Sequence, residues 1–136
     1  MILHTNSIQL YGHWYIKKNM SNSVHFIGDD GSILISKNKI AEGGTFVANG
    51  TNDCDLNITY NYSPIFYKVF PNDEGLRWLY GKTGKEATQI LEKTVKRLGT
   101  ERDSSYWNAT EGNAGFSLSI LLGWAKEFPN GKFAVY

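Results

Sequence analysis

The hydrophobic periodicity changes near residue 63, and this change constrains the fold more than any other feature of the sequence. Before that point, short segments alternate apolar and polar residues; after it, apolar residues recur every three to four positions. The first pattern is typical of strands with one buried face, and the second of amphipathic helices. Strands followed by helices predict an α+β fold, with an antiparallel sheet from the N-terminal half and two main C-terminal helices packed on one face.

Turn signals separate the expected strands. Asp29-Asp30-Gly31 predicts a tight hairpin turn, because an Asp-Gly pair tolerates the backbone conformation that such turns need. In residues 56–61 the period of two places the apolar side chains, including that of Tyr60, on one face and Asn57, Thr59 and Asn61 on the other. The expected strands cover residues 11–16, 25–28, 33–35, 45–48, 56–61 and 133–136.

Capping signals predict where the helices begin and end. Ser63-Pro64 predicts the start of a short helix, since Ser caps a helix and Pro suits its first position. Thr83 and Glu86 form a capping box ahead of an amphipathic segment that ends at Gly99. A last helix over residues 110–128 is apolar nearly all round, so we expect it at the centre of the fold or at a subunit interface.

Length, charge and cysteine content limit the classes of protein. A chain of 136 residues predicts a single domain, 1–136, and Met20 leaves residues 1–19 as a candidate N-terminal extension. The net charge of +1 gives no strong field, so nucleic acid is not expected as a partner. No apolar run approaches the ~18 residues of a membrane span, so no membrane partner is expected. Cys54 is the only cysteine, and the N-terminus lacks a leader pattern, which together predict a cytoplasmic protein.

Motifs for catalysis or metal binding are weak, so we expect no catalytic residue, no metal site and no cofactor. Gly81-Lys82-Thr83 invites comparison with a phosphate-binding loop, but five residues separate it from the preceding glycine where that motif has four. A Cys54–His25 nucleophile pair stays open, because such partners meet in space and not in sequence. Acid–base chemistry by two carboxylates, such as those of Glu74 and Glu111, also stays open.

Three segments combine polar and aromatic residues at high density: 57–61, 77–83 and 106–113. Amides and hydroxyls contact polar ring edges, aromatic faces stack on a base, and Arg or Lys neutralises phosphate. The alternative is that the rings fill a core and the polar side chains cap turns and helix ends. The predicted ligand-binding residues are Asn57, Thr59, Asn61, Arg77, Trp78, Tyr80, Lys82, Thr83, Tyr106, Trp107, Thr110 and Asn113.

Several of these motifs carry a family resemblance. They are residues 57–64, Gly81-Lys82-Thr83-Gly84, and Tyr106-Trp107-x-x-Thr110-x-Gly112-Asn113-Ala114 leading into residues 121–125. Over about residues 53–133 the chain resembles a family of small uncharacterised proteins from phages and bacterial genomes. That family has no assigned activity, and its phage context implies counter-defence, as in small phage proteins that sequester nucleotide immune signals between subunits.

The expected function is therefore a binding protein and not an enzyme. The chain is expected to be a homo-oligomer that sequesters a nucleotide-like ligand, such as a cyclic ADP-ribose derivative, without turnover, in the host cytoplasm if it is phage-encoded. Two alternatives stay open. One is a protein–protein inhibitor that binds a host factor through its aromatic surface. The other is a small hydrolase that uses carboxylates.

Overall fold

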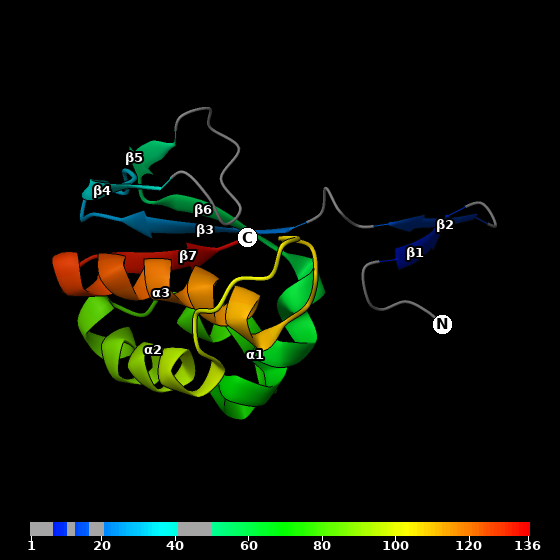
Figure 1. Ribbon diagram of the computed structural model, residues 1–136. Helices are drawn as coiled ribbons and strands as arrows, with labels where there is room; N and C mark the ends of the chain where they lie inside the picture. Colours follow the sequence, from blue (N-terminus) through cyan, green and yellow to red (C-terminus); the bar gives the residue numbers. More distant parts are fainter. Residues whose placement is uncertain (1–6, 11–12, 17–20, 41–49) are drawn as a thin grey trace.

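The computed structural model describes residues 7–10, 13–16, 21–40 and 50–136 (Figure 1). It confirms the predicted α+β class, with antiparallel strands in the N-terminal half and two C-terminal helices packed together. The expected strand over 45–48 lies outside the described residues. The elements are β1 (Ser7–Leu10), β2 (His13–Ile16), β3 (Ser21–Ile27), β4 (Ile35–Ile40), β5 (Thr51–Asp53), β6 (Asp55–Thr59), η1 (Tyr60–Tyr62), α1 (Ser63–Val69), η2 (Pro71–Asp73), η3 (Gly75–Leu79), α2 (Gly84–Leu98), α3 (Glu111–Glu127) and β7 (Lys132–Val135), where η denotes a 3-10 helix.

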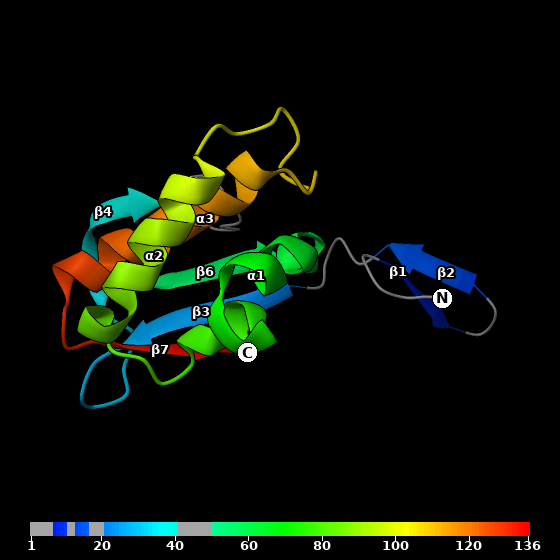
Figure 2. The same ribbon diagram turned by 90° about the horizontal axis from the view of Figure 1, so that it is seen from below.

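Within the described ranges, the central sheet has three antiparallel strands in the order β6-β3-β7, so β7, near the end of the sequence, pairs with β3 (Figure 2). Val24 of β3 lies opposite both Leu56 of β6 and Val135 of β7. Two smaller pairs accompany this sheet: β1 pairs with β2, and β4 pairs with β5. The register places buried apolar residues of all three strands on the same face, which the helices cover.

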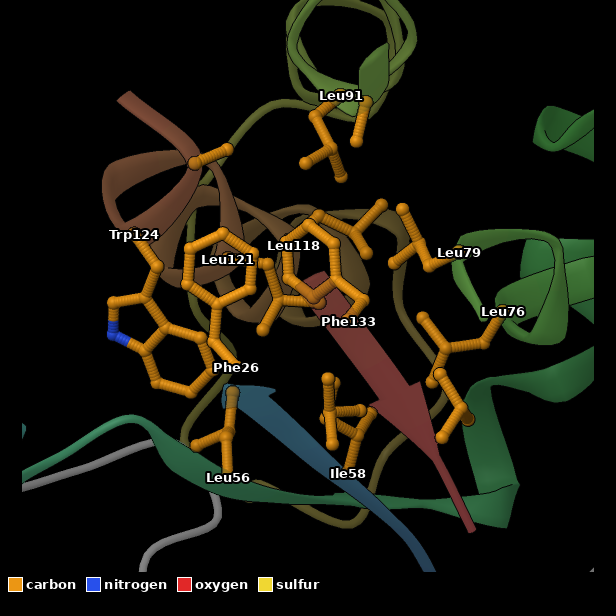
Figure 3. Close-up of a cluster of buried hydrophobic side chains, with 14 of the residues drawn as sticks. Phe26, Leu56, Ile58, Leu76, Leu79, Leu91, Leu118, Leu121, Trp124 and Phe133 are labelled. Atoms are coloured by element: carbon orange, nitrogen blue, oxygen red, sulfur yellow. The ribbon is translucent and has the colours of Figure 1, made fainter. Parts of the chain in front are cut away.

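The hydrophobic core lies between that face and the helices (Figure 3). Phe26 and Phe133, on neighbouring strands, pack with tilted rings whose centroids are 4.3 Å apart, and Trp124 of α3 stacks on Phe26 with a centroid distance of 6.4 Å. Leu91 of α2 and Leu118 of α3 are fully buried in the same cluster. The last helix is therefore central to the fold, which was one of its two expected places.

The predicted face pattern of residues 56–61 is wrong beyond Ile58. The strand ends at Thr59, whose side chain accepts a hydrogen bond from the Asn61 amide and starts a 3-10 turn. Because the backbone changes from a strand, with two residues per repeat, to a 3-10 turn, with three, Thr59 and Asn61 both face inward and are buried, while Tyr60 is half-buried. The strand's polar face therefore continues only as far as Asn57.

The predicted helix boundaries agree closely with the structure. Both hydrogen bonds of the capping box between Thr83 and Glu86 are present, and Gly99 follows α2 with a φ of 76°. Thr110 caps α3 by accepting from the Asn113 amide. Among the described residues, we find no helix with both the length and the apolar content needed to cross a membrane.

Candidate functional site

One group of predicted binding residues gathers where β6 ends. Tyr106 lies along the outer edge of β6, the edge without a neighbouring strand in the described sheet. Its hydroxyl accepts a hydrogen bond from the Thr59 amide at 2.9 Å and donates to the Asn57 carbonyl at 3.2 Å. Tyr106 thus occupies the position of a strand neighbour and satisfies backbone groups that an edge strand leaves unpaired. Burial raises the pKa of its phenol.

Two residues of the turn after β6 hold the backbone around Tyr106. Asn61 donates from Nδ2 to the Trp107 carbonyl at 2.6 Å, and the Tyr62 hydroxyl donates to the Tyr106 carbonyl. Tyr62 is fully buried, and its burial raises the pKa of its phenol well above the ordinary value. The Trp107 ring packs edge-on against Tyr106, with ring centroids 5.1 Å apart.

Asn113 organises the loop between α2 and α3. Its Oδ1 accepts from the Asp103 amide at 2.8 Å, while its Nδ2 donates to the carbonyls of Ser105 at 3.0 Å and Asn108 at 2.9 Å. The side chain is 4% exposed, so these contacts replace water inside the loop. Both polar atoms of this predicted binding residue are therefore engaged by the protein's own backbone.

Two glycines let the same loop lie directly on α3. A Cβ added at Gly112 would stand 1.8 Å from the Glu101 carbonyl oxygen, and one at Gly115 would stand 1.8 Å from that of Gly99. Neither distance is sterically possible without a backbone shift. The glycines after Tyr106-Trp107 therefore serve the close approach of two backbone segments of this chain.

The second group of predicted binding residues lies on and after η3. Arg77 donates from Nη1 to the Val135 carbonyl at 3.1 Å, at the outer edge of β7. The Lys82 ammonium lies 4.5 Å from the centre of the Trp78 ring. Tyr80 is 51% exposed, so its ring is open to solvent. Arg77 therefore joins η3 to β7, and Thr83 caps the first turn of α2.

The structure brings Thr59, Asn61, Tyr106 and Asn113 together beside the Asn57 backbone, but not all of the predicted residues. The Asn57 side chain instead accepts hydrogen bonds from Ser21 and Ser23 of β3, and the residues on and after η3 form a separate group. What the first four residues surround is the chain's own loop and strand edge, which agrees with the alternative of turn and helix capping. Asn61 keeps one buried group, Oδ1, for which no partner is found among the described residues. Ligand binding by these residues stays a prediction.

A groove that the sequence did not indicate runs along one face of α3. Asn113, Phe116, Ile120 and Gly123 follow one another at spacings of three and four residues, so they share this face. A cavity of about 390 Å³ lies between this face and β4, lined by Ser36, Asn38, Lys39, Ile40, Phe116, Ser119, Ile120, Gly123 and Trp124. We call the four α3 residues, with the cavities that adjoin them, the α3 groove.

A second cavity of about 280 Å³ meets the first at Phe116, which lines both. Its other walls come from η1, from the loop between α2 and α3, and from the first turn of α3, namely Tyr62, Arg102, Asp103, Ser104, Tyr106 and Asn113. The Arg102 guanidinium lies 4.6 Å from the centre of the Phe116 ring. Two predicted binding residues, Tyr106 and Asn113, therefore reach the α3 groove at this end.

Toward the other end of the groove, two hydrogen bonds join β4 to Glu127 of α3. The Ser36 hydroxyl donates to one carboxylate oxygen of Glu127 at 2.7 Å, and the Lys37 amide donates to the other at 2.9 Å. The Ser36 hydrogen bond is the main cause of a lowered pKa at Glu127. Glu127 lies four residues after Gly123 and so extends the same helix face.

Groups suited to nucleophilic or metal chemistry are not assembled in the described residues. Cys54 is fully buried, and burial raises the pKa of its thiol to about 12, so the thiol stays protonated at neutral pH. His25 contacts Asp55 instead, with Nε2 3.3 Å from Oδ1. Within the ranges that the structure describes, no group of three or more His, Cys, Asp and Glu could hold a metal ion.

Comparison with protein-family models, with curated proteins and with solved structures found no match to this chain. The resemblance to a phage and bacterial family therefore stays a prediction.

Proposed function

We propose that this protein binds a small nucleotide-like ligand in the α3 groove and holds it without turnover. The observation that supports the proposal most is the meeting of two cavities at Phe116 along a single helix face. The larger cavity, at about 390 Å³, lies within the range of roughly 300–1,000 Å³ that small-molecule sites occupy.

The chemistry of the walls supports a ligand with a flat apolar part and a polar, anionic part. Ile40, Ile120 and Trp124 supply apolar surface, and Asn38 supplies an amide at the rim. Small-molecule sites combine such apolar lining with a few polar groups that fix orientation. A cation lines each cavity, Lys39 in the larger and Arg102 in the smaller, and these side chains are suited to a phosphate.

Gly123 adds a second argument. Glycine inside a helix costs about 1 kcal/mol relative to alanine, and among the described residues no atom beyond the neighbouring backbone of α3 lies within 4 Å of an added Cβ. The described structure therefore has no steric need for glycine at this position, unlike Gly112 and Gly115. A ligand that lies against the helix backbone in the groove would require glycine here, because any larger side chain would occupy its place.

Titration calorimetry with a panel of mononucleotides, cyclic nucleotides and cyclic ADP-ribose tests the proposal. We expect at least one member to bind below about 100 μM and to be recovered intact after heat denaturation of the protein. Gly123→Phe fills the larger cavity and should abolish binding. Gln89→Phe is the matched control, because it adds the same ring at an exposed position of α2, and it should leave binding unchanged.

The outcomes separate the parts of the proposal. A folded protein that binds no member of the panel contradicts it, and so does binding that survives Gly123→Phe. Recovery of a cleaved ligand retains the site but replaces sequestration with hydrolysis. The counter-defence role in a host cytoplasm rests on the family resemblance of residues 53–133. The same resemblance is the reason to test cyclic ADP-ribose and related nucleotides first.

A further inference from the structure

We propose that five side chains across the sheet form a surface at which two copies of this chain pair about a twofold axis. These residues, which we call the tyrosine row, are in spatial order Asp55, His25, Tyr136, Tyr80 and Arg77. The proposal is independent of the α3 groove.

The tyrosine row is continuous from one edge of the sheet to the other. Asp55 of β6 contacts His25 of β3 at 3.3 Å, and the His25 ring meets the ring of Tyr136, just after β7, edge-on at 5.5 Å. Tyr136 in turn meets Tyr80 edge-on, with ring centroids 6.3 Å apart. The Arg77 guanidinium lies 5.8 Å from the centre of the Tyr80 ring and closes the row beyond β7.

The middle of the row is aromatic and exposed. Tyr80 is 51% exposed and Tyr136 is 61% exposed, although each ring already packs against a neighbour in the row. Tyrosine is enriched at the centres of protein interfaces, and here two adjacent tyrosines leave a large part of their surface exposed to solvent. Their edge-to-face contact also positions the rings before any partner arrives, which lowers the entropy cost of docking.

The ends of the row carry opposite charges, and this asymmetry identifies the partner. An isologous twofold axis places a surface against its own reversed copy. Reversal of the row sets Arg77 of one copy against Asp55 of the partner subunit, and the tyrosines of both copies meet near the axis. The charge order is therefore self-complementary: each dimer contains two Arg–Asp pairs around an aromatic centre.

A charge exchange tests this arrangement directly. Arg77→Glu places two carboxylates opposite each other in a homodimer, and Asp55→Lys places two cations there. We expect sedimentation velocity to give a dimer for the wild type at about 100 μM and a monomer for each variant alone. When the two variants are mixed, both pairs become complementary, so a heterodimer should form.

The tyrosines provide a second test that leaves the charged ends unchanged. Tyr136→Ala should weaken the dimer by at least about tenfold, whereas Tyr67→Ala should leave it unchanged. Tyr67 is a matched control because it is 53% exposed on α1 and lies outside the row. If Arg77→Glu fails to fold because it loses the Val135 contact, Asp55→Lys and Tyr136→Ala still decide the matter.

Three results would overturn the proposal. They are a wild-type chain that stays monomeric at about 100 μM, a dimer that Asp55→Lys and Tyr136→Ala leave intact, and folded charge variants that do not pair when mixed. If such a monomer binds a host protein through Tyr80 and Tyr136, the tyrosine row serves that partner and not a second copy of the chain.

Discussion

Replacing Tyr106 by Phe should lower the free energy of unfolding by about 2 kcal/mol. The substitution removes one hydroxyl and, with it, two hydrogen bonds to the backbone of β6, from the Thr59 amide at 2.9 Å and to the Asn57 carbonyl at 3.2 Å. Thr59 is 1% exposed, so water does not readily replace the lost acceptor. Leaving a buried backbone group unpaired costs about 1–3 kcal/mol, which sets the expected magnitude.

Urea denaturation followed by tryptophan fluorescence measures this effect. The ring of residue 106 keeps its contacts with Tyr62 and Trp107, so the urea dependence of the free energy should not change and only the midpoint should fall. Tyr67→Phe is the control, because it removes the same hydroxyl at an exposed position, and it should cost less than about 0.5 kcal/mol. A loss below about 0.5 kcal/mol for Tyr106→Phe would refute the role given to Tyr106 as a cap of the strand edge.

Other substitutions give further expected outcomes. Gly115→Ala should lower the free energy of unfolding, measured in urea, by about 3 kcal/mol, because the added Cβ would lie 1.8 Å from a backbone carbonyl oxygen. Gly123→Ala should raise the free energy of unfolding by about 0.5–1 kcal/mol, because alanine favours the helix and meets no steric obstacle. Similar effects at both positions would contradict this contrast. Thr83→Ala should cost about 1 kcal/mol in a thermal melt, since it removes one half of the capping box of α2. Ser36→Ala should raise the pKa of Glu127 toward its ordinary value in an NMR titration, and no rise would rule out the hydroxyl as the cause. The folded-state pKa of Glu127 is lowered, so its hydrogen bonds to β4 stabilise the fold fully above the ordinary carboxyl pKa. This stabilisation is lost as the pH falls through the lowered pKa. The NMR shift of the Lys37 amide in an acid titration should follow the loss.

The helices could be predicted from the sequence because their signals are local. The capping box of Thr83 and Glu86, and Gly99 after the last turn, depend on residues that are close in the chain, and α2 follows them. The end of β6 could not be predicted in the same way. Residues 56–61 keep an alternating pattern, but the hydrogen bond from the Asn61 amide to the Thr59 hydroxyl changes the backbone from strand to 3-10 turn.

The candidate site was only partly predictable, for a physical reason. Polar side chains such as that of Asn113 do converge, but an amide forms the same hydrogen bonds with a ligand as with the carbonyls of its own loop. Local sequence does not distinguish the two. The α3 groove escaped prediction because its walls come from β4, from α3 and from the loop that carries Arg102, and only the folded chain brings these segments together.

The most direct test of the binding site is an NMR titration of the isotope-labelled protein with the member of the nucleotide panel that binds in calorimetry, followed at the backbone amides. If the ligand lies in the α3 groove, the largest shifts should fall on Phe116, Ile120 and Gly123 and, across the cavity, on Asn38. Shifts concentrated instead on Trp78 and its neighbours in η3, or no shifts at saturating ligand, would contradict binding in the α3 groove.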